Sequence, residues 1–417
     1  MVDLSDIRDA AARLQGTIAA TPLERSRALS GGPVGSVYLK CENLQRTGSF
    51  KIRGALNRIS RLSDSERGAG VVAASAGNHA QGVALASALE GTAATIFMPE
   101  GAALPKIAAT ESYGAEVKIA GSNVDEAMAA AKDFADTTSA MLIPPFDNHD
   151  IVAGQGTVGL EILDQLPTTS TIVVSLGGGG LLAGIACAVK SLAAEHGRTI
   201  RVVGVQAEAA AAWPASLETG RPVALAGMDT MADGIAVGRP GDIPFELIRR
   251  LVDDVVTVSE EALSSALLLL HERAKLTVEP AGAAAAAAVM ERPRDVAGSN
   301  GSAGGDTVAV VSGGNIDPLL MLRLLRHGLS AAGRYLHLTV RIPDHPGALA
   351  GLLEVLAAHD TNILEISHVR TGRRLGAHEV SVDLQVETRG ADHCRTVIAA
   401  IGAAGYAVHV EEGDREV

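Results

Sequence analysis

Hydrophobic positions along the first three quarters of the chain follow two repeats in turn. Short apolar runs, typical of buried strands, alternate with segments in which apolar residues recur at helical spacing. Strands are expected at residues 36–42, 70–74, 95–98, 116–119, 171–175, 200–205, 255–258 and 307–311. Helices are expected at 3–15, from 53 onward, and at 81–89, 105–113, 124–134, 154–165, 181–194, 260–275, 281–290 and 317–327. This alternation predicts an α/β architecture of parallel sheets covered by helices on both faces.

The hydrophobic pattern changes after residue 327. Residues 328–334 have the composition of a linker, so a domain over 1–327 and a second over 335–417 are expected. In the second, the pattern predicts strands at 335–342, 362–369, 379–386 and 407–411 and helices at 348–359 and 391–400. This βαββαβ order is ferredoxin-like. The Gly- and Ser-rich residues 298–305 are expected to form a surface loop, and residues 371–372 a turn.

Composition narrows the function classes. The chain of 417 residues is long enough for two or three structural units. Its 35 basic and 48 acidic residues give a net charge of −13, which argues against a nucleic-acid or anionic membrane partner. Three separated cysteines indicate neither a disulfide framework nor a zinc ribbon. The acidic N-terminus lacks a signal-peptide core, and four glycines divide the uncharged stretch 172–189, so a cytoplasmic protein without a membrane span is expected.

The run TGSFKIRGA at residues 47–55 is the first candidate for chemistry. Lys51 lies where a loop following a strand becomes a helix. The first N–H groups of a helix have no partner within it, so an amine at this place can be held against a flat cofactor. An ordinary surface lysine is the alternative for a lone lysine.

The longer run ENLQRTGSFK, residues 42–51, resembles the cofactor-lysine motif of fold type II pyridoxal-phosphate enzymes, especially threonine ammonia-lyases and serine racemases. The resemblance implies pyridoxal phosphate as cofactor, joined to Lys51 through a Schiff base, with Phe50 beside it. It also implies two parallel-sheet lobes, the smaller one, at about residues 50–150, inserted in the larger. Behind them, the C-terminal domain resembles the ACT regulatory domain.

A glycine run follows the strand expected at 171–175 and opens the next helix. Glycines let the backbone fold closely around an anion, and the free N–H groups and dipole of a helix start favour a phosphate. A structural turn needs only one or two glycines, and no nucleotide-binding G-x-x-x-x-G-K-[ST] motif is present. The run resembles the tetraglycine loop that holds the cofactor phosphate in the family. The cofactor-binding residues implied here are Gly177, Gly178, Gly179, Gly180 and Leu181.

Two polar loops are expected at the carboxyl ends of strands, where open α/β sheets place their ligands. The first comprises Ser75, Ala76, Gly77, Asn78 and His79. Its hydroxyl and N–H groups are candidates for holding a substrate carboxylate, and resemblance to the family's asparagine loop implies that the Asn78 amide bonds the cofactor's phenolic oxygen. A plain turn is the alternative, and His79 could instead cap or buttress the loop.

The second loop begins at Ser312 and resembles the segment whose serine faces the cofactor's ring nitrogen. An aspartate there would keep the nitrogen protonated, whereas a hydroxyl leaves it essentially neutral and so weakens the electron sink. A weaker sink suits elimination better than transamination.

In the C-terminal domain, one loop matches the loop with which ACT domains bind amino acids. It comprises Asp344, His345, Pro346 and Gly347. The resemblance therefore implies an allosteric amino-acid effector and a homodimer or homotetramer.

The activity implied is elimination from L-threonine to give 2-oxobutanoate and ammonium, as in isoleucine biosynthesis, with L-serine as a possible second substrate. A serine ammonia-lyase or racemase of the same fold is the nearest alternative, and a non-catalytic amino-acid sensor is another. Racemases carry a second serine where this chain has Ala76. Their metal carboxylates would fall near residues 204–212, where only Glu208 stands between Gln206 and Ala212, so no metal is expected.

Overall fold

The computed structural model describes residues 1–298, 305–370, 375–376 and 378–410. The inner part of the expected loop 298–305 and the expected turn at 371–372 lie outside these residues, as does residue 411 of the last expected strand. The chain divides into two compact units, Met1–Pro318 and Leu319–Val417, each described here by itself.

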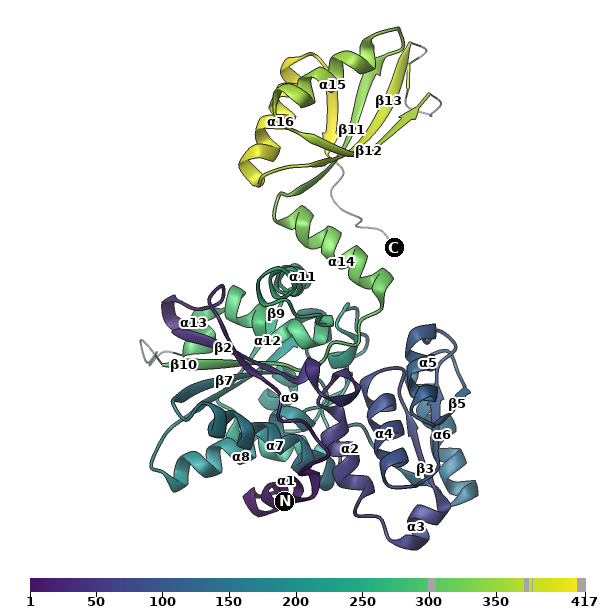
Figure 1. Ribbon diagram of the computed structural model, residues 1–417, viewed down its shortest axis with the longest axis vertical. Coiled ribbons are helices and arrows are strands. Elements are labelled where there is room, and N and C mark those ends of the chain that lie inside the picture. The colour runs from purple at the N-terminus through teal and green to yellow at the C-terminus, as the bar shows by residue number, and fades with distance from the viewer. Residues whose placement is uncertain (299–304, 371–374, 377, 411–417) are drawn as a thin grey trace. The chain divides into compact units, whose positions relative to one another are not determined.

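The first unit is built on a six-stranded sheet with the order β1-β2-β10-β7-β8-β9 (Figure 1). Its strands are β1 Leu23–Ser26, β2 Ser36–Cys41, β7 Thr169–Ser175, β8 Arg201–Ala207, β9 Asp254–Val258 and β10 Asp306–Val311. All neighbours are parallel except β1 and β2. Because the central strands are buried on both faces, they are continuous Val- and Ile-rich runs instead of alternating ones.

Helices cover both faces of this sheet. In Figure 1, α11 and α12 lie on one face and α7 and α8 on the other. The helices of this lobe are α1 Leu4–Leu14, α2 Lys51–Ile59, α7 His149–Gln165, α8 Gly180–Glu195, α9 Ala212–Thr219, α10 Asp242–Leu251, α11 Glu260–Leu269, α12 Pro280–Glu291 and α13 Pro293–Ala297. After α11 the chain makes a π-helical turn, Leu270–Ala274, within the helix expected at 260–275.

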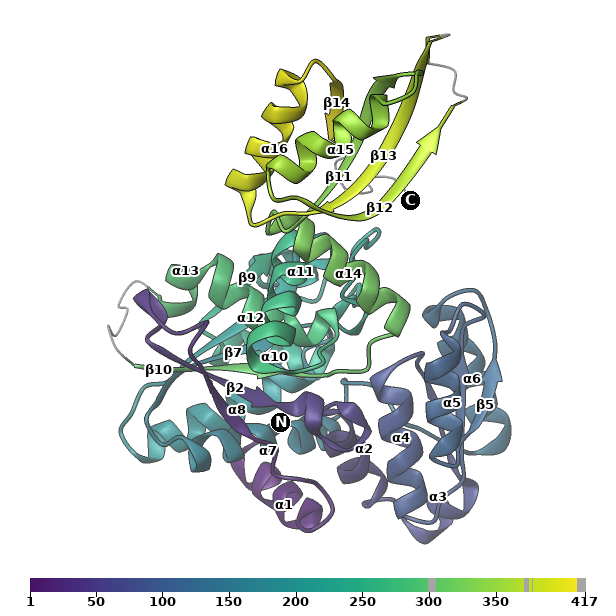
Figure 2. The ribbon, with the colours of Figure 1, turned by 45° about the horizontal axis from the view of Figure 1, so that its top comes forward.

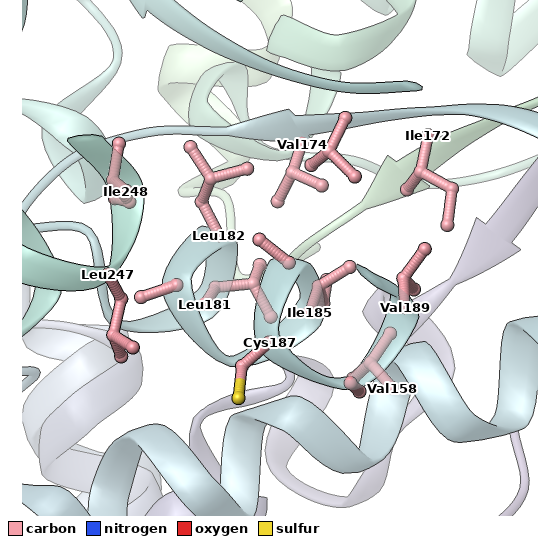
Figure 3. Close-up of a cluster of buried hydrophobic side chains, with 14 of the residues drawn as sticks. Val158, Ile172, Val174, Leu181, Leu182, Ile185, Cys187, Val189, Leu247 and Ile248 are labelled. Carbon is pink, nitrogen blue, oxygen red and sulfur yellow. The ribbon is translucent and has the colours of Figure 1, made fainter. Parts of the chain in front are cut away.

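The core of the larger lobe is packed between β7 and the helix α8. Figure 3 shows Leu182 and Ile185 of α8 facing Val174 of β7, and all three side chains are fully buried. Helices α7 and α8 approach so closely that a Cβ built on Gly184 would lie 2.4 Å from the carbonyl oxygen of Val152. Only glycine fits at this crossing, which holds the N-terminus of α8 in place relative to α7.

The smaller lobe is a four-stranded parallel sheet with the order β5-β4-β3-β6. Its strands are β3 Val71–Ala74, β4 Ala94–Met98, β5 Glu116–Ile119 and β6 Met141–Leu142, and its helices are α3 Asp64–Ala69, α4 Asn78–Leu89, α5 Leu104–Ser112 and α6 Val124–Thr138. The chain enters this lobe after α2 and leaves it before α7. The fold class expected from the sequence, two parallel-sheet lobes with one inserted in the other, is confirmed.

A cluster of buried charges joins β2, α2 and α7 beside Lys51. The Arg53 guanidinium, 1% exposed, donates to both carboxylate oxygens of Glu42 at 2.8 Å and to Glu161 at 2.6 Å. The Lys40 ammonium donates to the other oxygen of Glu161, also at 2.6 Å. Burial alone would lower the pKa of Arg53, but the two carboxylates raise it, so the guanidinium stays charged. We call these four residues the Arg53 cluster.

The second unit contains the helix α14 Pro318–Ala331 and a four-stranded antiparallel sheet with the order β12-β13-β11-β14. Its other elements are β11 Tyr335–Pro343, α15 Ala348–Ala358, β12 Asn362–Val369, β13 Glu379–Glu387, α16 Ala391–Ala403 and β14 Ala407–Val410. Helices α15 and α16 lie on one face of this sheet (Figure 2). They enclose a separate apolar core that includes Leu338, Val340 and Leu352.

The boundary between the units differs from the expected one. Residues 328–331, expected to be linker, continue α14, and Gly328 is buried within it. The surrounding leucine, arginine and alanine residues are strong helix formers, so one glycine does not end the helix. The division falls instead at Pro318, where α14 begins. Across the described part of the chain, each helix is too short or too polar to cross a membrane.

Candidate active site

Lys51 is the first residue of α2 and is half-buried. Its ammonium donates a hydrogen bond of 3.0 Å to the carbonyl oxygen of Pro145 and lies 5.4 Å from the centre of the Phe50 ring. Desolvation lowers the pKa of Lys51 to about 8, although the Glu279 carboxylate opposes this. A sizeable fraction of the amine is therefore neutral, and so nucleophilic and basic, near neutral pH.

The glycine run forms the turn between β7 and α8. Gly179 adopts a positive φ of 98° and caps the helix, which begins at Gly180, one residue before the expected start. The first hydrogen bond of the helix runs from Ala183 to the carbonyl of Gly179. The N–H groups before it, of Gly180, Leu181 and Leu182, precede the helical ladder and suit an anion.

Aromatic side chains back this glycine loop. A Cβ on Gly178 would lie 2.4 Å from the Phe146 ring, and one on Gly179 would lie 2.6 Å from the Trp213 ring. The indole N–H of Trp213 donates to the carbonyl oxygen of Gly177 at 2.7 Å. The glycines are therefore required by packing on the aromatic side, and that packing holds the backbone in a fixed turn.

The loop after β3 brings Asn78 to the same region as Lys51. Helix α4 begins at Asn78, three residues before the expected start, with Gly77 as its cap. The Ser75 hydroxyl accepts a hydrogen bond of 3.1 Å from the N–H of Gly77. The Asn78 amide donates to Glu279 at 2.5 Å and accepts from the Asn315 amide at 2.8 Å.

His79 turns away from this loop into the protein. Its Nε2 lies 2.8 Å from the carbonyl oxygen of Ile143, which can only accept, so Nε2 carries the proton. Burial and the nearby Lys51 charge lower the pKa of His79 to about 3, so the ring is neutral. These contacts correspond to the buttressing role that the sequence left open.

Ser312 ends β10 and is buried beside the lysine loop. Its hydroxyl accepts a hydrogen bond of 3.0 Å from the Ser175 hydroxyl, at the end of β7. Its carbonyl oxygen accepts from the N–H of Phe50 at 3.2 Å. Two neutral hydroxyl groups thus occupy the place where the sequence predicts the partner of a ring nitrogen.

Glu279 is a site residue that the sequence did not reveal. It precedes Pro280 at the start of α12, and an acidic residue before a helix is ordinary there. The protein around its half-buried carboxyl raises the pKa of Glu279 to about 7, mainly by desolvation. A Cβ on Gly313 would lie 2.1 Å from its Oε1 atom, so the glycine after Ser312 makes room for this carboxyl.

These residues fit pyridoxal phosphate. The free N–H groups at the start of α8 suit its phosphate, the partly neutral Lys51 amine suits its aldehyde, and neutral Ser312 and Asn78 suit its ring substituents. The expected effector loop, Asp344 to Gly347, belongs to the other unit. Within the described ranges, no three His, Cys, Asp or Glu side chains are grouped as a metal site would require.

Three known proteins and one family model resemble this chain. The model described as "Pyridoxal-phosphate dependent enzyme" matches residues 14–313. The L-threonine ammonia-lyase of Thermotoga maritima is 43% identical over 410 residues, which make up 98% of this chain and 100% of that protein. The structure of the T.th. threonine deaminase matches with a TM-score of 0.69 at 40% identity, over 76% of this chain and 99% of that one. Maize serine racemase matches with a TM-score of 0.73 at 33% identity, over 79% of this chain and 98% of that one.

The lowered pKa of Lys51 gives a first prediction. Only a neutral amine attacks an aldehyde, so the rate at which cofactor-free enzyme captures pyridoxal phosphate should rise with pH and level off above about pH 8. An unperturbed lysine would level off near pH ~10.4. Stopped-flow absorbance measures this rate, and Lys51→Arg, which keeps the charge, should lack the phase. A plateau reached only above pH ~10 would contradict the proposed desolvation.

A second prediction concerns the packing behind the glycine loop. The Gly178→Ala variant places a methyl group against the Phe146 ring, so the loop or the ring must move. We expect a loss of about 1–3 kcal/mol in the free energy of unfolding and weaker cofactor binding. Thermal unfolding and equilibrium dialysis measure the two effects. The control is Gly227→Ala, where a Cβ meets nothing within 4 Å, and equal behaviour of the two variants would refute the packing argument.

Proposed function

The chain belongs to the pyridoxal-phosphate dependent enzyme family, and from this premise we propose that it converts L-threonine to 2-oxobutanoate and ammonium. L-Serine, which would give pyruvate, is proposed as a secondary substrate. The observation that carries the proposal is the desolvated Lys51 amine, with a pKa of about 8, in the site that also holds the glycine loop, Asn78 and Ser312. The similarity of the whole chain to the Thermotoga maritima L-threonine ammonia-lyase supports this choice of substrate.

Pyridoxal phosphate, when bound, withdraws electrons from the α-carbon of an amino acid and so makes its α-proton acidic. We propose that the N–H groups of residues 177–181 hold the phosphate and that Lys51 is the covalent attachment point. The amide of Asn78 and the hydroxyl of Ser312 would contact the ring substituents. The loop of residues 75–79 would hold the substrate carboxylate through its hydroxyl and N–H groups.

Lys51 also serves as the base in this proposal. Once the substrate amine has displaced it, the Lys51 amine is free to take the α-proton, and its lowered pKa keeps much of it neutral for that task. The Pro145 carbonyl oxygen, 3.0 Å from the amine, would orient it. The β-hydroxyl then leaves, and hydrolysis of the resulting enamine gives the 2-oxo acid and ammonium.

The residue types around the site favour elimination over the alternatives. The neutral Ser312 and Ser175 pair would leave the ring nitrogen unprotonated, which disfavours transamination. Ala76 offers no exchangeable proton where racemases carry a serine, so a lyase is favoured over a racemase despite the similarity to maize serine racemase. A non-catalytic sensor would have no need of a desolvated lysine.

We propose that the C-terminal unit is an ACT-like regulatory domain. Its loop at residues 344–347 is exposed and leads into α15, whose cap Gly347 has a positive φ of 92°. The Asp344 carboxylate lies 3.3 Å from the Arg370 guanidinium, so the loop presents both charges that an amino acid carries in reverse. The T.th. threonine deaminase leaves about a quarter of this chain unmatched, which is compatible with a regulatory part that is separate from the chemistry.

An effector bound by this loop would act through a homodimer or homotetramer, because ligands that bind at a junction between copies bias their arrangement. We further propose a cytoplasmic location, since free thiols at Cys41, Cys187 and Cys394 suit a reducing compartment.

Replacing the proposed base tests the activity. Lys51→Ala removes both the attachment point and the base, so 2-oxo acid release from L-threonine should fall by at least roughly 10²–10⁴-fold. A coupled assay for 2-oxobutanoate and pyruvate measures this with threonine and serine in parallel. The control is Lys132→Ala, on an exposed face of α6. More than a tenth of wild-type activity in Lys51→Ala would rule out this mechanism.

Regulation has a separate test. In the intact enzyme, we expect isoleucine, valine, leucine or threonine to change the activity with a coupling of about 1–3 kcal/mol. A chain ending at Pro318 should keep the elimination activity and lose this response. Gly347→Ala should weaken the response in the full chain because of its positive φ, whereas the control Gly402→Ala, in open space, should not. Identical titrations of the full and shortened chains would leave the domain without a regulatory role.

A further inference from the structure

A chain of hydrogen bonds links the lysine loop to Glu279 through two asparagine amides. It begins at the carbonyl oxygen of Thr47, which accepts from the Asn315 amide nitrogen at 2.6 Å. The same nitrogen donates to the Asn78 amide oxygen at 2.8 Å, and the Asn78 amide nitrogen donates to Glu279 at 2.5 Å. The chain connects Asn78, in the smaller lobe, with Glu279 and Asn315 in the larger lobe.

The direction of every bond in this chain is fixed by its first member. A backbone carbonyl can only accept, so the Asn315 nitrogen must face Thr47 and Asn78. The Asn78 oxygen must then face Asn315, and its nitrogen must face Glu279. Glu279 therefore accepts at Oε1, as an ionised carboxylate does, and neither amide can flip without losing two bonds.

The backbone supports the same arrangement. A Cβ on Gly48 would lie 2.3 Å from the Asn315 amide oxygen, and one on Gly313 would lie 2.1 Å from Glu279 Oε1. The N–H of Glu279 also donates to the carbonyl of Gly313 at 3.2 Å. Both asparagine partners are thus held by turns that have room only for glycine.

This arrangement leaves Asn78 with one specific capacity. Its contacts with described residues use the amide oxygen and one of the two N–H bonds, and the second N–H remains for a ligand. We propose that Glu279 and Asn315 are positioning residues that clamp the Asn78 amide and aim this second N–H at an anionic oxygen on the cofactor ring. This inference rests on the proposed function only in taking pyridoxal phosphate as the ligand.

The charge on Glu279 determines the strength of the clamp. A hydrogen bond to a carboxylate is stronger than one to a neutral acid or amide. The charged groups that act on Glu279 are Lys51 at the start of α2, Lys106 on α5 and Asp233 in the turn before α10; desolvation, the largest effect, raises the pKa of Glu279 to about 7. The clamp should therefore weaken as the pH falls below about 7, where the carboxyl takes up a proton.

The test compares Glu279→Gln, Glu279→Ala and Asn315→Ala with the surface control Glu261→Gln, on α11. The cofactor dissociation constant is measured by absorbance titration of cofactor-free enzyme, without substrate. We expect the affinity at pH 8 to fall roughly ten- to hundredfold in Glu279→Ala and Asn315→Ala and by less in Glu279→Gln, because charged hydrogen bonds are worth that much. The control should bind as wild type does. Thermal unfolding identifies any variant that fails to fold, and the near-isosteric Glu279→Gln then decides the question.

The pH dependence separates positioning from a general structural role. The ratio of wild-type to Glu279→Gln affinity should approach one below about pH 7, since both side chains are then neutral. The Lys51 capture rate in Glu279→Gln should level off at a lower pH than in wild type, because the carboxylate that favours the protonated amine is gone. A constant affinity ratio from pH 6 to pH 8.5, or wild-type affinity in Glu279→Ala, would overturn the inference. Because substrate is absent, a failure of the threonine assay would leave this result unaffected.

Discussion

The buried ion pairs of the Arg53 cluster are the constraint on which the site depends. Removing a charge from water costs several kcal/mol, and the cost is offset only while every partner stays in place. Arg53 lies two residues after Lys51 on α2, and its partners Glu42 and Glu161 come from the end of β2 and from α7. The loop that carries Lys51 is thereby held at both ends, because any shift of α2 would leave a buried charge without its partner.

The segment that links the lobes extends this constraint to the rest of the site. It runs from Ile143, whose carbonyl accepts from His79, through Pro145, whose carbonyl accepts from Lys51, to Phe146, which packs on the glycine loop. Asp147 then accepts from the N–H groups at the start of α10. Four consecutive contacts along five residues thus fix the smaller lobe, the lysine, the anion-binding turn and α10 relative to one another.

Sequence patterns revealed those parts of the site that consist of unusual residues in one short stretch. The four glycines and the lysine run are recognisable because ordinary turns and helices do not need them. Glu279 and Phe146 are ordinary residues of their types, and only folding brings them to Asn78 and Gly178, more than thirty residues away in each case. No local pattern could have placed them, since their roles arise from contacts between distant segments.

Element boundaries show the same division. Strand β5 lies where its apolar run predicted, but α7 begins at His149 instead of 154 because the Asn148 side chain caps it with hydrogen bonds to Asp150 and Ile151. A capping residue acts before the apolar repeat starts, so periodicity alone places the helix too late. Helices α9 and α10 were not expected at all. They lie between β8 and β9, where the sequence is broken by proline and glycine and the periodic stretches are short.

The electrostatics of the site follow from one physical cause acting on two groups of opposite charge. Desolvation lowers the pKa of Lys51 to about 8 and raises that of Glu279 to about 7, so each group is driven toward its neutral form. Each charge also stabilises the other, which limits both shifts. Near neutral pH the amine can therefore lose a proton, as a base must, while the carboxylate remains able to hold Asn78. A site with more water would return the amine to its ordinary basicity, and a site with less would protonate the carboxyl, so the half-buried state of both residues is what allows the two tasks to be performed at the same pH.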